Sequence, residues 1–204
     1  MEKKDFLVVL LLSLLRAVTS FSLLIAYQNI ATGVASTIHF MYPLAVSLVM
    51  MYFFQEKKSL CVMFAVFMSL LGAALLSSGE LEAKNGDTIV GLVAACVSVF
   101  SYAGYIVGVR MTCAVRINST VLTCYVMGLG TIFYLIGAYC TSGLQLVSDG
   151  YTWLIILGLA LPATAISNIT LVQAIKYAGP TLTSILGAME PLTAVVIGVF
   201  VFKE

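Results

Sequence analysis

The stretch ILGAMEPLTAVV, residues 185–196, decides the fold, because it places a carboxylate and a proline inside an apolar run. Glu190 and Pro191 are neighbours there, and neither suits the interior of an ordinary apolar segment. The composition indicates what surrounds them, since 61% of the 204 residues are hydrophobic and only 9% are charged. A soluble domain carries about 25% charged residues. The sequence therefore predicts a protein that lies almost entirely within a membrane.

Seven apolar runs are long enough to cross a bilayer, whose hydrocarbon core of about 30 Å needs roughly 20 apolar residues per helix. The runs are residues 6–27, 34–54, 59–78, 88–109, 120–140, 152–175 and 181–202. They are continuous rather than alternating, so helices are the remaining way to satisfy every backbone group in lipid. We expect an all-α fold, a polytopic membrane helix bundle with seven transmembrane helices.

The distribution of Lys and Arg predicts the orientation of the bundle. With the N-terminus in the cytoplasm, the inner loops hold Lys3, Lys4, Lys57, Lys58, Arg110, Arg116 and Lys176, and the outer side holds only Lys84 and Lys203. Basic residues concentrate in cytoplasmic loops. We therefore expect an integral protein of the cytoplasmic (plasma) membrane whose N-terminus is cytoplasmic.

Sequence motifs argue against several other classes. The chain has no P-loop, GxSxG elbow, zinc-protease motif or dinucleotide fingerprint. Its cysteines lie in or next to apolar runs without CxxC spacing, which favours packing over metal or redox chemistry; they are Cys61, Cys96, Cys113, Cys124 and Cys140. We expect no enzyme, no cofactor, no metal and no nucleic-acid partner.

An internal repeat relates the second run to the seventh. At an offset of 191 − 43 = 148, the segment from Ala26 aligns with the segment from Ala174, and the alignment pairs Pro43 with Pro191 and Glu56 with Glu204. The two helices are predicted to cross the membrane in opposite senses. Inverted repeats of this kind are typical of secondary transporters, whose substrate site lies near the midplane where the repeats meet.

A small-residue turn into a helix, a proline within it and a closing glutamate together resemble the EamA-like family of the drug/metabolite transporter superfamily. The residues that carry this resemblance are Ala35, Ser36, Pro43 and Glu56 in the first repeat and Gly179, Pro180, Ser184, Glu190, Pro191 and Glu204 in the second. The stretch GLVAACVSVFSYAGYIVGVR, residues 91–110, also resembles the opening helix of that family's second repeat.

The resemblance implies ten helices in two inverted repeats of five, of which the seven runs match the third to the ninth. We therefore expect residues 1–78 to form part of the first repeat, residues 79–87 to be an outer loop, and residues 88–204 to form part of the second repeat. Two helices would then be missing before Met1 and one after Glu204. The longer chain would supply them, or the protein would form a homodimer.

Glu190 and Arg16 are the charged residues that the sequence places near mid-membrane. The neighbours of Glu190 at helical spacing are small or polar, which predicts that it faces the protein interior. An ionisable residue at this depth costs roughly 2.5–3.5 kcal/mol on insertion scales and is a functional candidate. Two hypotheses stay open: Glu190 takes up a proton or balances a substrate, or it forms a structural ion pair with Arg16.

Pro43 and Pro191 are predicted helix breaks, because a proline leaves the carbonyl four residues earlier without its partner. Further candidates for substrate binding or coupling are His39, Tyr42, Tyr102, Tyr105 and Asn168. His39 could join a proton relay, the tyrosines offer amphipathic ring surfaces, and Asn168 offers hydrogen bonds. Each has a competing packing role, which for His39 is the favoured one.

The leading hypothesis is a secondary transporter of small organic metabolites that works by alternating access, with proton-coupled export as one form of it. Its partners would be the lipid bilayer and a small-molecule metabolite. One alternative is a truncated transporter fragment without function. A seven-helix receptor fits less well, because an inverted repeat and a cytoplasmic N-terminus are not typical of receptors.

Overall fold

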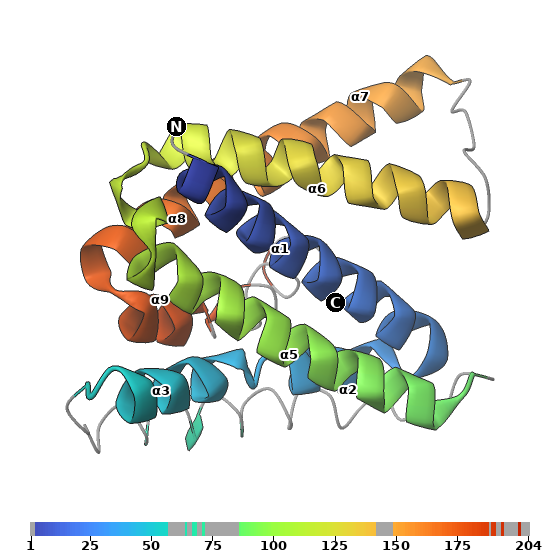
Figure 1. Ribbon diagram of the computed structural model, residues 1–204. Helices are drawn as coiled ribbons and strands as arrows, with labels where there is room; N and C mark the ends of the chain where they lie inside the picture. Colours follow the sequence, from blue (N-terminus) through green and yellow to red (C-terminus); the bar gives the residue numbers. More distant parts are fainter. Residues whose placement is uncertain are drawn as a thin grey trace. The chain divides into compact units, whose positions relative to one another are not determined.

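The computed structural model describes residues 3–56, 64, 67–68, 71, 86–141, 149–187, 189–190, 193 and 200. Every regular element in this part of the chain is a helix, so the all-α prediction is confirmed there (Figure 1). The elements are α1 (Lys3–Asn29), α2 (Thr32–His39), α3 (Tyr42–Phe53), α5 (Thr88–Met111), the 3₁₀ helix η1 (Cys113–Arg116), α6 (Ser119–Thr141), α7 (Gly150–Gly158), the π-helix η2 (Leu159–Ile166), α8 (Ser167–Ala178) and α9 (Pro180–Gly187).

Five helical stretches of the described residues are long and apolar enough to cross a membrane. They are Asp5–Asn29, Thr32–Phe53, Thr88–Met111, Ser119–Gly137 and Gly150–Ala178. These stretches overlap the first, second, fourth, fifth and sixth predicted runs. Most of the predicted run 59–78 and much of 181–202 lie outside the described residues, so seven helices stay a prediction.

Contacts divide the chain into two compact units. The first unit comprises Met1–Ala17 and Gly108–Gly179, and the second comprises Val18–Val107 and Pro180–Glu204.

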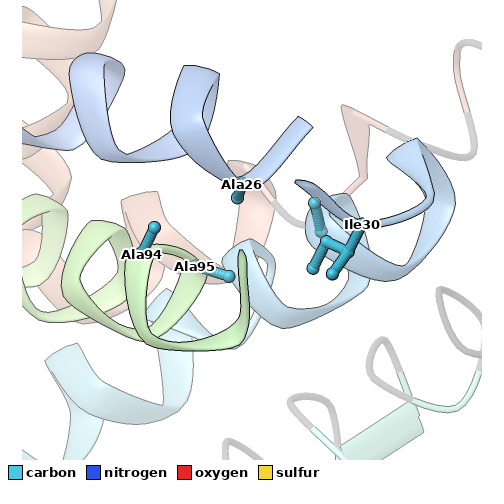
Figure 2. Packing of buried hydrophobic residues seen from close by; sticks show 5 residues of the cluster. Ala26, Ile30, Ala94 and Ala95 are labelled. Atoms are coloured by element: carbon cyan, nitrogen blue, oxygen red, sulfur yellow. The ribbon is translucent and has the colours of Figure 1, made fainter. Parts of the chain in front are cut away.

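Small side chains build the core of the second unit. Ala26 of α1 and Ile30, the residue after its end, pack against Ala94 and Ala95 of α5 (Figure 2). A Cβ added to Gly91 would lie 2.5 Å from the Ile30 Cγ2 atom, so only glycine fits there. Small residues at a helix interface let two backbones approach closely, which is how transmembrane helices associate without a hydrophobic driving force between them.

The second membrane span of the chain is interrupted in its middle. α2 ends at His39 and α3 begins at Tyr42, with Pro43 in its first turn. The Met41 N–H donates to the Ile38 carbonyl at 3.0 Å, which is the tighter i→i−3 spacing of a 3₁₀ turn. Because proline has no N–H to continue the α-helical pattern, the interruption falls just before it.

The backbone repeats this pattern near the C-terminal end of the described chain. α9 spans Pro180–Gly187, which is α2 shifted by 180 − 32 = 148 residues. The Met189 N–H donates to the Leu186 carbonyl at 3.0 Å, as Met41 does to Ile38. The Met41 carbonyl then accepts from Ala45 and the Met189 carbonyl from Thr193, at 3.3 and 3.0 Å. The predicted break at Pro191 lies outside the described residues.

α3 and α9 pack against each other in the second unit and run in opposite directions. Tyr42 at the start of α3 lies against Gly187 at the end of α9. Glu56, just after α3, accepts a hydrogen bond from Thr181 at the start of α9. The start of α3 thus lies beside the end of α9, and the chain just after α3 lies beside the start of α9.

The first unit packs α6 against α8. The Ser13 hydroxyl of α1 donates to the Val126 carbonyl of α6 at 3.3 Å, and a Cβ added to Gly108 would lie 2.7 Å from the Leu12 side chain. The π-helix η2 carries Pro162 inside it and joins α7 to α8. A proline in the middle of a span is tolerated when a local change of helix type satisfies the backbone.

Candidate functional site

Aromatic rings gather in the second unit beside the interruption of its broken helix. The Tyr42 and Tyr102 ring centroids are 4.7 Å apart with the rings at 78°, and Tyr102 stacks on Tyr105 at 6.3 Å. The His39 ring lies 5.4 Å from Tyr102 and 5.7 Å from Tyr42. All three tyrosines are buried. Such pairs add about 0.5–1.5 kcal/mol each beyond the burial of their area.

Ser98 fixes the hydrogen-bonding state of His39. The Ser98 hydroxyl donates to the Ala95 carbonyl at 2.6 Å, and its oxygen lies 2.9 Å from His39 Nδ1. A serine has one proton to donate. Because that proton is used on Ala95, the His39 Nδ1–H is the donor to Ser98. In the neutral ring the basic nitrogen is therefore Nε2.

Gly187 at the end of α9 lies against the same group of side chains. A Cβ added to Gly187 would overlap the Tyr42 hydroxyl oxygen. Glu190 follows three residues later and is exposed. Tyr42 is 3% exposed, so its ring is held between α5 and α9. The site thus combines an imidazole and tyrosine rings, and the Glu190 carboxylate lies just beyond the helix end that contacts Tyr42.

A second polar group lies in the first unit. Arg16, at the midpoint of α1, donates from Nη2 to the Asn168 Oδ1 at 3.5 Å, and the Asn168 Nδ2 donates to the Thr164 carbonyl at 2.7 Å. Thr164 belongs to the π-helix, and Asn168 is 5% exposed. The wider turns of a π-helix occur frequently at functional sites.

The predicted site residues therefore fall into two groups. The second unit brings together His39, Tyr42, Tyr102 and Tyr105, and Pro43 lies in the first turn of the helix that carries Tyr42. Glu190 belongs to the same unit and is exposed beyond the end of α9. The first unit brings Arg16 to Asn168. Arg16 and Glu190 belong to different units, so the hypothesis of an ion pair between them stays a prediction.

Three residues in the second unit were not predicted as site residues. Gly187 accommodates the Tyr42 hydroxyl, and the hydroxyls of Ser47 and Thr183 are buried with no hydrogen-bond partner among the described residues. Thr183 lies one turn before Gly187, so it occupies the same face of α9. The small and polar stripe around Glu190 was the sequence signal for Gly187 and Thr183, and it does not include Ser47. The described residues contain no group of three or more side chains that could hold a metal ion.

Long apolar helices, with polar and aromatic side chains gathered beside an interrupted span, define an integral membrane protein. A comparison with protein families matches residues 89–204 to the EamA-like transporter family. The chain belongs to this family, which indicates a membrane transporter of small molecules. A comparison with curated proteins found no match.

Proposed function

We propose that the protein is a secondary transporter that moves small organic metabolites across the plasma membrane by alternating access. The observation that carries the proposal is the meeting of His39, Tyr42 and Tyr102 beside an interrupted span. Secondary transporters bind their substrates at discontinuous helices near the bilayer midplane. A ligand site needs apolar walls and a few polar groups that fix orientation, and the tyrosine and histidine side chains supply both.

The proposal includes two inverted repeats of a ten-helix fold, with residues 1–78 in the first and 88–204 in the second. The equal hydrogen-bond patterns at Met41 and Met189, 148 residues apart, support it. The opposite directions of α3 and α9 also support it, since inverted repeats cross the membrane in opposite senses. The family match begins at residue 89, one residue after the proposed start of the second repeat.

The proposal also places the protein in the plasma membrane with its N-terminus in the cytoplasm. The excess of Lys and Arg in alternate loops favours a cytoplasmic N-terminus. The family match is to transporters, so the receptor hypothesis gains no support from it.

Counterflow in proteoliposomes tests the proposal. Vesicles containing the protein are loaded with an unlabelled amine, amino acid or nucleobase, and uptake of the labelled form of the same compound is measured. We expect exchange of at least one compound, which Tyr102→Ala abolishes. Tyr125→Ala is the matched control, because Tyr125 is 46% exposed on α6 and should exchange like the unmodified protein. Exchange no faster than in empty vesicles for every compound would refute the proposal.

A further inference from the structure

Three basic residues of the first unit come together where its helices end. Arg110, near the end of α5, donates from Nη1 to the carbonyl of Lys176 near the end of α8. The Lys176 Nζ donates in turn to the carbonyl of Ile117. Ile117 follows Arg116, which is the last residue of η1. We call Arg110, Arg116 and Lys176 the basic cluster.

The hydrogen bonds of the basic cluster hold its side chains in place without neutralising them. Both acceptors are backbone carbonyls, which carry no net charge. A guanidinium has five N–H donors and an ammonium has three, and each of these contacts uses one. Within the part of the chain that the structure describes, Arg110 and Lys176 therefore keep donors for an anion.

One carboxylate lies near the basic cluster. Burial and a hydrogen bond to Asp5 raise the pKa of the Cys113 thiol, and Arg116 lowers it, so both charged groups are close to Cys113. The other described acidic residue of the first unit, Asp149, precedes α7 and is separated from Lys176 by almost the whole span Gly150–Ala178. Three cations and one carboxylate give this end of the unit a positive charge.

The basic cluster lies at the depth where membrane spans end. Arg110 is the last residue but one of the α5 span, Lys176 is two residues before the end of the α8 span, and Arg116 precedes the α6 span by three residues. Lys and Arg at helix ends extend toward the interface between hydrocarbon and water. The lipid phosphates occupy that interface, so the cations and the phosphates share one level.

Apolar and aromatic side chains beside the basic cluster are exposed. Met111 follows Arg110, Tyr177 follows Lys176, and Val121 lies in the first turn of α6; all three are exposed. Tyrosine is enriched at the membrane–water interface, and the other two side chains offer surface to acyl chains. A ligand with an anionic head and apolar chains matches this surface better than a soluble anion does.

We propose that the basic cluster binds the headgroup phosphate of an anionic phospholipid. Guanidinium and ammonium groups bind phosphate oxygens through charge-assisted hydrogen bonds. Basic pockets between transmembrane helices bind anionic headgroups in the same way. The bound lipid bridges the ends of α5 and α8 and the chain between η1 and α6. The inference does not depend on the proposed transport function.

Native mass spectrometry of the full chain in detergent tests the inference. Dioleoyl-phosphatidylglycerol, which is anionic, and dioleoyl-phosphatidylcholine, which has the same chains and no net charge, are titrated separately, and the dissociation constant of the first bound lipid is measured. We expect phosphatidylglycerol to bind more tightly. Arg116→Gln and Lys176→Gln should each weaken its binding about fivefold, the equivalent of roughly 1 kcal/mol per cation near an anionic lipid. Binding of phosphatidylcholine should not change.

Lys84→Gln is the matched control, because it removes the same charge from the predicted outer loop. It should leave both dissociation constants unchanged. Arg116 is exposed, and the glutamine of Lys176→Gln keeps an N–H donor for the Ile117 carbonyl. The melting temperature without added lipid verifies that each variant is folded.

Three results would each overturn the proposal. The first is an equal dissociation constant for the two lipids in the unmodified protein. The second is an unchanged phosphatidylglycerol constant in either folded cluster variant. The third is displacement of phosphatidylglycerol by an equal concentration of glycerol 3-phosphate, which has the phosphate without the chains and would assign the cluster to a soluble anion.

Discussion

The Thr181 hydroxyl donates a 2.5 Å hydrogen bond to the Glu56 carboxylate and so joins the first turn of α9 to the chain just after α3. Gln55 makes this reach possible, because its φ of 52° places the backbone in the left-handed region that ends α3. The Glu56 N–H then donates to the Met50 carbonyl at 3.1 Å.

Thr181→Val should therefore destabilise the protein. A hydrogen bond to a charged group contributes about 1.5–3 kcal/mol, and the lower value applies because Glu56 is exposed. Thermal unfolding in detergent measures the loss. Thr170→Val is the control, because the Thr170 hydroxyl bonds only to carbonyls of its own chain segment, Ile166 and Ser167. Equal melting temperatures for the two variants would contradict the interhelix role.

Gly187→Ala should be more harmful than an alanine at an open glycine. The new Cβ would overlap the Tyr42 hydroxyl oxygen, and overpacking of this kind costs about 1–3 kcal/mol. Gly130→Ala on α6 has nothing within 4 Å and should raise the melting temperature slightly. Because Tyr42→Phe removes the clashing oxygen, the double variant should recover part of the loss. If the double variant melts no higher than Gly187→Ala alone, the clash with the Tyr42 hydroxyl is not the cause of the loss.

Ser98→Ala should change the tautomer of His39. With its acceptor removed, the Nδ1–H loses the bond that favours this form, and a buried donor without a partner costs about 1–3 kcal/mol. The chain contains one histidine, so the ¹⁵N NMR spectrum of histidine-labelled protein reports on His39 and should show a larger share of the Nε2–H tautomer. Ser101→Ala, a buried serine three residues further along α5, should leave the spectrum as it is. A Ser98→Ala spectrum like that of the unmodified protein would argue against the assigned donor.

Thr183→Val tests whether an unpartnered hydroxyl has a functional role. Replacing a buried hydroxyl that has no partner by a methyl group of the same shape should leave stability unchanged or increase it by about 1 kcal/mol. If a substrate uses this hydroxyl, counterflow should slow while the melting temperature holds or rises. A stability loss like that of Thr181→Val would mean that the hydroxyl is bonded in the folded protein.

Asp149 gives the start of α7 a dependence on pH. The backbone N–H of Tyr151, followed by the hydroxyl and N–H of Thr152, lowers the pKa of the Asp149 carboxyl below its ordinary value of about 3.9. A lowered pKa means that the cap stabilises the helix above the unfolded-state pKa and is lost as the pH falls through the folded-state pKa. Exchange of the Tyr151 amide, relative to that of an α8 amide, should therefore accelerate in that range. Asp149→Asn should remove this step, and a persisting step would assign it to another group.

The sequence alone could predict the class of fold and most of the spans. Apolar runs of about 20 residues have few alternatives to membrane helices, and five of them overlap spans of the structure. The span predicted at 34–54 proved to be two helices, since Phe40 and Met41 form a tight turn before Pro43. Pro43 predicted a break in the helix. The position of the break depends on which carbonyls the N–H groups of Phe40 and Met41 reach, and these are Ser36 and Ile38.

The candidate site was predictable by residue type but not by contact. Ser98, Tyr102 and Tyr105 share one face of α5 because they follow at helical spacing. Their approach to His39 and Tyr42 depends on how α2, α3 and α5 pack, which no local pattern in one sequence contains. The contact of Gly187 with Tyr42 needs the placement of α9 as well. The hydrogen bond that Arg16 donates to Asn168 in the first unit depends on packing in the same way, and the hypothesis of an ion pair between Arg16 and Glu190 stays a prediction.

The most direct test of alternating access is the reactivity of a single cysteine, Thr183→Cys, in a variant whose five native cysteines are replaced. Thr183 lies one turn from Gly187 on the α9 face that meets Tyr42. A membrane-impermeant maleimide is added to oriented vesicles from one side or from the other. We predict labelling from both sides with no leakage of a trapped dye, because the site opens to each side in turn. Labelling from one side only, or from both sides with dye leakage, would contradict the account.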